Sequence, residues 1–219
     1  MRMIKAVIFD MDGVIFDTER LCIECWERLA EKYGLSGVRE VCLQCIGITE
    51  NVTREIFLKA YGKDFPYEER KKEMVQIFQE SCGAFPPLKE GVREALDEIR
   101  LLKLPMALAS STREEIVRQE LTAAGLDVYF DRIIGGNRAK RSKPAPDIFL
   151  MAAESLGAAP ADCCVIEDSF NGIRAAHAAG MMPLMVPDLL QPDEEILGMA
   201  EKVFSSLREA AGYISSAVG

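Results

Sequence analysis

Short apolar runs recur along the chain, and each of them ends in a polar or glycine-rich turn. An apolar run of this length predicts a parallel strand that is covered on both faces. We expect strands at 4–9, 105–109, 132–135, 163–166 and 182–186, with a weaker one at 202–204.

Helical spacing of apolar residues fills most of the segments between these runs. The segments are 89–103, 112–124, 146–156 and 169–179, and the last three are each followed by or close to a glycine that can end a helix. Alternation of strands and helices predicts an α/β fold with an open, doubly wound (Rossmann-like) parallel sheet.

One region breaks this alternation. From about Thr18 to Gly83 the pattern is helical throughout, with helices expected over 19–33, 51–61 and 67–82. A segment of this length is too long for an ordinary loop. It predicts an all-helical cap domain at 17–85, inserted into a core domain made of 1–16 and 86–219. The two crossings between the domains are expected to form a hinge.

Composition narrows the possible partners. The chain of 219 residues carries a net charge of −9, which argues against a nucleic-acid or anionic-membrane partner. No apolar run approaches the roughly 20 residues of a membrane span. The chain shows no signal-peptide pattern, so we expect a cytoplasmic protein. Its seven cysteines lie in a chain with a sizeable core, which favours free thiols over a disulfide framework. A monomer is the default expectation.

Four of the cysteines have the spacing of a zinc site, Cys22-x2-Cys25 and Cys42-x2-Cys45. The first pair, however, lies in a helical stretch that lacks the glycine-bearing turns of zinc ribbons. With Trp26 these residues form an apolar stripe, and free cysteine packs as a small hydrophobe. The pattern therefore indicates packing, with zinc as the alternative.

Polar side chains follow the predicted strands. Ligands of open α/β sheets bind at the carboxyl ends of the strands, so these side chains are expected to gather at one edge. They are Asp10 and Asp12 after the first strand, Ser110, Ser111 and Thr112 after the second, Lys143 after the third, and Glu167 and Asp168 after the fourth.

The chemistry of this set is coherent. Carboxylate oxygens suit Mg²⁺, while a lysine and a serine suit phosphate oxygens. One carboxylate can attack phosphorus and a second can exchange protons. Each residue alone could be a helix cap or a solvated loop residue, but their common position favours a functional site. A receiver-type signalling domain is a rival, yet it has no helical insertion and carries its phosphorylated aspartate later in the chain.

Four segments resemble the motifs of the haloacid dehalogenase-like superfamily. They are FDMDGVIFDTE, ALASST, SKPAPDIF and VIEDSFNGIRAAHAAGM. The helical insertion is similar to the helical cap of that superfamily, and the chain resembles its branch of β-phosphoglucomutases and sugar-phosphate phosphatases.

The resemblance implies a role for each motif residue. Asp10 would be the nucleophile, and Asp12 would protonate the leaving oxygen and later activate water. Mg²⁺ would be held by Asp10, Asp168, the backbone carbonyl of Asp12 and, directly or through water, Glu167. The phosphate would be held by Ser110, the Ser111 amide and Lys143.

The same resemblance leaves two activities open. Mutases of this branch have a histidine where this chain has Cys22, and an arginine where it has Glu50. The basic run 70–72 could supply a cation for a second phosphate, but we interpret it as a solvent-exposed helix face. We therefore expect a phosphatase acting on a small phosphorylated metabolite, either a sugar phosphate or a nucleotide-like monoester. The alternative is a β-phosphoglucomutase-type phosphomutase.

Glu50, Arg113 and Asn171 are further candidates for the substrate pocket.

Overall fold

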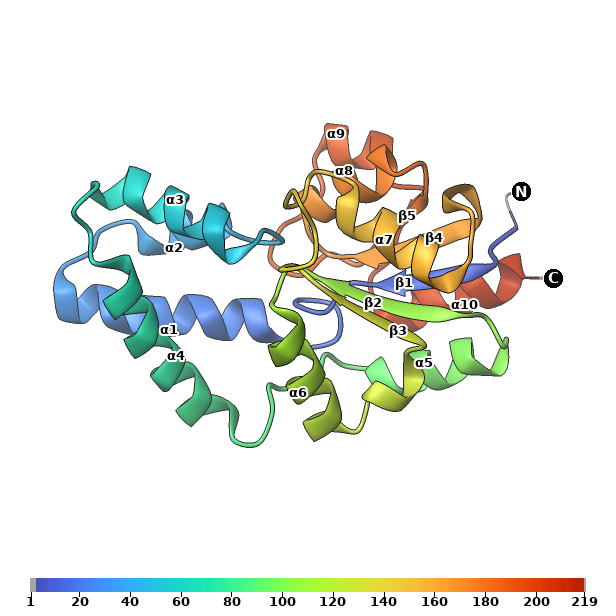
Figure 1. Cartoon of the computed structure of the whole chain (residues 1–219), viewed down its shortest axis with the longest axis horizontal. Helices are drawn as coiled ribbons and strands as arrows, with labels where there is room; N and C mark the ends of the chain where they lie inside the picture. The colour runs from blue at the N-terminus through green and yellow to red at the C-terminus, as the bar shows by residue number, and fades with distance from the viewer. Residues whose placement is uncertain (1–2, 219) are drawn as a thin grey trace.

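The computed structural model describes residues 3–218, which contain one six-stranded sheet with the strand order β3-β2-β1-β4-β5-β6 (Figure 1). Neighbouring strands are parallel at every pairing. The strands are β1 (Ala6–Phe9), β2 (Met106–Ser110), β3 (Arg132–Gly135), β4 (Cys163–Glu167), β5 (Met182–Met185) and β6 (Lys202–Val203). The predicted doubly wound α/β fold is confirmed.

Both faces of the sheet are covered by helices, which explains the continuous apolar runs. In β1, Val7 and Phe9 join one buried cluster, and Ala6 and Ile8 join another on the opposite face. The first cluster includes α5 (Val92–Leu101), α6 (Glu114–Ala124) and α10 (Leu207–Ala217), while the second includes α7 (Asp147–Leu156) and α8 (Phe170–Ala178). A short helix, α9 (Glu194–Met199), packs against α8. No helix within residues 3–218 is long and apolar enough to cross a membrane.

A helical insertion follows β1 and lies beyond one end of the sheet (Figure 1). It consists of α1 (Thr18–Tyr33), α2 (Val38–Leu43), α3 (Glu50–Tyr61) and α4 (Tyr67–Cys82). These helices share an apolar cluster of their own, in which the rings of Trp26 and Phe57 lie 4.4 Å apart. The sequence predicted three of the four helices. It missed α2, because six residues are too few to show a helical period.

The cysteines of the zinc-like pattern pack inside this insertion. Cys25 and Cys42 belong to its buried cluster, and Cys22 and Cys45 pack against it. All four are free thiols, and within residues 3–218 they do not join any group of three potential metal ligands. Burial raises the pKa of Cys22 and of Cys42, so these thiols stay neutral and behave as apolar groups.

The chain enters and leaves the insertion through two adjacent segments. The amide of Asp17 donates to the carbonyl of Pro87 at 2.8 Å, and the amide of Lys89 donates to the carbonyl of Ile15 at 2.9 Å. Phe16 and Leu88 form an antiparallel bridge between them. The two segments are therefore paired at the positions where the sequence predicts a hinge.

Candidate active site

Three polar residues of the sequence motifs meet at the carboxyl end of the sheet. Asp10 directly follows β1, Glu167 ends β4, and Asp168 comes next. Because β1 and β4 are neighbours, and the Asp10 amide donates to the Ile166 carbonyl at 3.0 Å, the three carboxylates are brought to one place. All three side chains are buried.

Lys143 joins this group from the loop between β3 and α7. Its Nζ lies 2.6 Å from Oδ1 of Asp10 and 2.7 Å from Oε1 of Glu167. Burial alone would lower the pKa of Lys143, but the charges of Asp10 and Glu167 outweigh it and hold the pKa above its ordinary value. The lysine is therefore a fixed, buried cation beside Asp10.

The carboxylates outnumber this cation. Asp10, Glu167 and Asp168 offer oxygen atoms that all lie within 4.8 Å of one another. Burial, together with the charges of Glu167 and Asp10, raises the pKa of Asp168 well above its ordinary value. A hard divalent cation such as Mg²⁺ prefers oxygen ligands of this kind and would offset the excess negative charge. The donor set therefore fits Mg²⁺. The Asp12 carboxylate is not part of it.

Two glycines permit this close packing. Gly13 has a φ of +79°, and a Cβ at this position would overlap Oδ2 of Asp168. A Cβ at Gly172, in the first turn of α8, would overlap Oε1 of Glu167. The sequence indicated the turn at Gly13, whereas the need for Gly172 becomes visible only when α8 is placed against β4.

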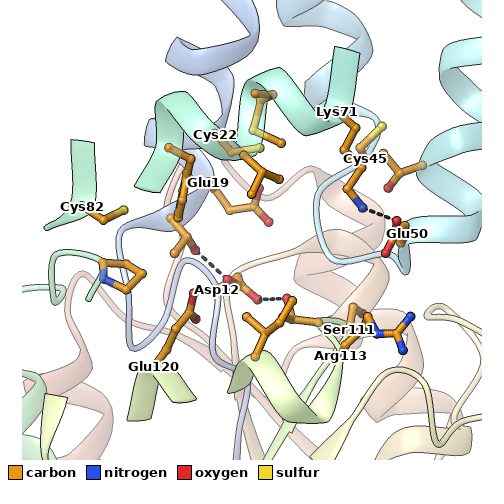
Figure 2. A pocket seen from close by; sticks show the side chains of 18 of the residues that line it. Asp12, Glu19, Cys22, Cys45, Glu50, Lys71, Cys82, Ser111, Arg113 and Glu120 are labelled. Atoms are coloured by element: carbon orange, nitrogen blue, oxygen red, sulfur yellow. Dashed lines mark hydrogen bonds and ion pairs between the residues drawn. The ribbon is translucent and has the colours of Figure 1, made fainter. Parts of the chain in front are cut away.

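Asp12 is held by three hydroxyl groups. Thr18 donates to its Oδ1 at 2.7 Å, and Thr112 and Ser110 donate to its Oδ2 at 2.9 Å and 3.1 Å. These donors fix the orientation of the carboxylate at the edge of a pocket (Figure 2). Sequence reasoning assigned no role to Thr18, although its position in the FDTE segment places it at the start of a helix six residues after Asp12.

Ser110 contacts other residues of the site. Its role in holding phosphate oxygens stays a prediction: the side chain is fully buried, does not line the pocket, donates to Asp12 and accepts from the Thr112 amide. The reason is that Ser110 is still part of β2, one residue below the edge of the sheet. Ser111 does line the pocket, and its Oγ donates to the Gly47 carbonyl at 2.9 Å, which links the core to the insertion.

The pocket is a cavity of about 580 Å³ between the sheet edge and the insertion. Asp10 and Asp12 contribute to its lining from the core. The insertion supplies an apolar wall that includes Trp26, Phe57 and Phe78. A volume of this size holds a small metabolite.

The other predicted pocket residues divide into two groups. Glu50 and Arg113 line the cavity, whereas Asn171 does not and donates to the Ile46 carbonyl at 3.3 Å. Glu50 forms an ion pair with Lys71, which also lines the cavity (Figure 2). The interpretation of the basic run as a solvent-exposed face is therefore wrong for Lys71.

Two carboxylates of the pocket were missed. Burial, with Asp12 as the next cause, raises the pKa of Glu19 to about 8 and that of Glu120 to about 8. Glu19 follows the first motif and could have been suspected from its position. Glu120 lies inside α6, and the sequence carries no signal that this turn of the helix faces a pocket.

Known proteins resemble this chain over most of its length. A model of the haloacid dehalogenase-like hydrolases matches residues 7–186. A phosphorylated carbohydrates phosphatase of Thermotoga maritima is 36% identical over 181 residues, which cover 81% of this chain and 82% of that protein. A β-phosphoglucomutase of Bacillus subtilis is 33% identical over 191 residues, covering 83% of each.

A solved structure shows the same relationship. The crystal structure of β-phosphoglucomutase from Clostridium difficile superposes with a TM-score of 0.80 at 28% identity, covering 99% of this chain and 97% of that one. The family match and the phosphatase relative confirm the predicted enzyme class, a phosphohydrolase of this type. The chain belongs to the haloacid dehalogenase-like hydrolase family.

Proposed function

We propose that this enzyme is a Mg²⁺-dependent phosphatase that hydrolyses the monoester of a small phosphorylated metabolite, of the sugar-phosphate class, through an aspartyl phosphate on Asp10. One observation carries the proposal: Asp10 lies 2.6 Å from the buried Lys143 ammonium and lines the same cavity as Asp12. A cation beside a carboxylate at the edge of a pocket suits attack on a phosphoryl group. The phosphatase of Thermotoga maritima supports the substrate class.

The first step transfers the phosphoryl group to the protein. A carboxylate oxygen of Asp10 forms a bond to phosphorus while the ester bond breaks, and Asp12 gives a proton to the leaving oxygen. Lys143 neutralises negative charge on the phosphoryl oxygens, and the hydroxyls of Thr18 and Thr112 hold Asp12 in place.

The second step releases phosphate. Asp12, now deprotonated, takes a proton from a water molecule, whose oxygen bonds to phosphorus while the Asp10–phosphorus bond breaks. Phosphate leaves, and both aspartates return to their starting states. Mg²⁺ bound by Asp10, Asp168 and Glu167 would supply further positive charge to the phosphoryl oxygens.

We also propose that the chain divides into a core domain (1–16 and 86–219) and a cap domain (17–85). The separate apolar cluster of the helical insertion supports this division, as do the paired crossings. Closing of the cap over the sheet edge would exclude bulk water from the reaction. The contact between Ser111 and the Gly47 carbonyl joins the two parts beside the pocket.

The choice of hydrolase over mutase rests on the pocket lining. Cys22 lines the cavity where mutases of this branch have a histidine, and the single histidine of the chain, His177, is exposed on α8. Glu50 is a weaker argument than the sequence indicated, because Lys71 offsets its charge. We keep the phosphomutase as the second candidate, since a β-phosphoglucomutase is among the relatives.

Removal of divalent metal tests the proposed function. We expect EDTA to suppress phosphate release from p-nitrophenyl phosphate and from sugar phosphates, because Asp168 and its neighbours would lose their cation. Added Mg²⁺ should restore the activity, measured as free phosphate. Full activity in EDTA would contradict the metal dependence, and no phosphate release with Mg²⁺ from any monoester would contradict the phosphatase itself.

A second experiment separates the two candidate activities. We expect phosphorus NMR of the enzyme with β-glucose 1-phosphate and Mg²⁺ to show inorganic phosphate as the main product, because the pocket has no histidine in place of Cys22. Glucose 1,6-bisphosphate should be present to prime any mutase. Formation of glucose 6-phosphate faster than phosphate release would establish the mutase instead.

A further inference from the structure

Two carboxylates that the proposed chemistry does not use lie in the pocket. Glu19 belongs to the first turn of α1 and Glu120 to α6, so one comes from the insertion and the other from the core. Figure 2 shows the side chain of Glu120 rising toward Asp12, with Glu19 above it. The two residues therefore border the part of the cavity next to Asp12.

Neither carboxylate is offset by a basic group. Within residues 3–218, Glu19 and Glu120 form no ion pair, in contrast to Glu50, which pairs with Lys71. The proximity of Asp12 adds to the effect of burial in raising the pKa of each side chain. Figure 2 places Lys71 and Arg113 away from Glu120, on the side of the pocket where Glu50 lies. Above about pH 8, where both side chains are ionised, negative charge is therefore concentrated beside Asp12.

The leaving group must occupy this part of the cavity if the proposed function holds. Asp12 protonates the leaving oxygen, so the carbon atoms attached to that oxygen begin next to Asp12. Groups on those carbons then meet Glu19 and Glu120. Hydroxyls can donate hydrogen bonds to these carboxyl groups, whereas a carboxylate or a second phosphate is repelled once Glu19 and Glu120 are ionised.

We propose that Glu19 and Glu120 are specificity-determining residues that select a leaving group with hydroxyls near the ester oxygen and reject one with an anionic group there. The apolar part of the pocket lining is consistent with this selection. It includes Phe85, Pro86 and Ile116, which offer no positive charge to an anionic substituent. The substrate is therefore a polyol or sugar monophosphate with its charge confined to the transferred phosphate.

Competitive inhibition of p-nitrophenyl phosphate hydrolysis tests this selection. Glycerol 3-phosphate and 3-phosphoglycerate are suitable inhibitors, because they differ mainly in a hydroxymethyl group replaced by a carboxylate. We expect glycerol 3-phosphate to inhibit the wild-type enzyme about tenfold more strongly in an assay roughly one pH unit above 8, where both glutamates are ionised. At this pH, Glu19→Gln and Glu120→Gln should each reduce the ratio several-fold, since each removes one negative charge and keeps the shape of the side chain.

Matched controls are available on exposed positions. Glu24→Gln, on α1, and Glu154→Gln, on α7, remove the same charge outside the pocket and should leave the ratio unchanged. An unchanged ratio in both pocket variants, or stronger inhibition of the wild type by 3-phosphoglycerate, would overturn the inference. A wild-type enzyme that releases no phosphate from p-nitrophenyl phosphate would instead contradict the proposed function. Thermal unfolding checks that each variant is folded, and either pocket variant alone is sufficient for the comparison.

Discussion

Replacing Asp10 by asparagine is expected to reduce phosphate release by at least roughly 10⁴-fold, because an amide does not attack phosphorus as a carboxylate does. The fold should survive the change. Lys143 keeps its bond to Glu167 at 2.7 Å, and the crowded group of carboxylates loses one negative charge. The measurement is the initial rate of hydrolysis of p-nitrophenyl phosphate with Mg²⁺, together with the thermal unfolding midpoint.

The matched control is Asp64→Asn, which makes the same chemical change at an exposed position in the turn between α3 and α4. This variant should retain wild-type activity. Rapid acid quenching offers a second readout, since the wild type should trap phosphate on the protein and the Asp10 variant should not. Retention of more than about a tenth of the wild-type rate by Asp10→Asn would exclude Asp10 as the nucleophile.

Much of the core domain was predictable, because its strands and the polar residues that follow them are visible in short stretches of the sequence. Strand β1 is buried on both faces, so residues 6–9 are all apolar, and parallel strands gather their following residues at one edge. This rule places Asp10, Glu167 and Asp168 together without any coordinates. Helix α2 was missed because its six residues contain less than two helical turns.

The pocket was harder to predict because it depends on how the insertion faces the core. Glu120 and Lys71 look like ordinary surface residues in their helices, and only the packing of α4 and α6 around the cavity gives them a role. Ser110 gains a contact that the sequence did not indicate. Its motif predicts contact with phosphate, which stays a prediction, and its position within β2 brings the hydroxyl to Asp12.

Removal of the positive charge at Lys143 is expected to destabilise the protein and to abolish activity. In Lys143→Met, the buried carboxylates of Asp10 and Glu167 lose their common partner, and breaking a buried pair in this way costs about 3–5 kcal/mol. A methionine can keep the contact with Phe149, whose ring centroid lies 4.8 Å from the lysine Nζ. The loss should therefore reflect charge and not volume. Urea unfolding gives the free energy of unfolding for the comparison.

A double variant tests whether Lys143 stabilises the protein through its ion pair with Asp10. Asp10→Asn in the Lys143→Met background removes one of the unpaired carboxylates, so the double variant should be more stable than the sum of the single changes predicts. Mg²⁺ should also raise the unfolding midpoint of Lys143→Met more than that of the wild type, because the cation would offset charge that the lysine no longer neutralises. Lys63→Met, at an exposed position, serves as the control. It should change neither the free energy of unfolding nor the rise of the unfolding midpoint that Mg²⁺ causes. Additive effects of the two changes would mean that Lys143 stabilises the fold without acting through Asp10, and its electrostatic role in the reaction would then have to be abandoned.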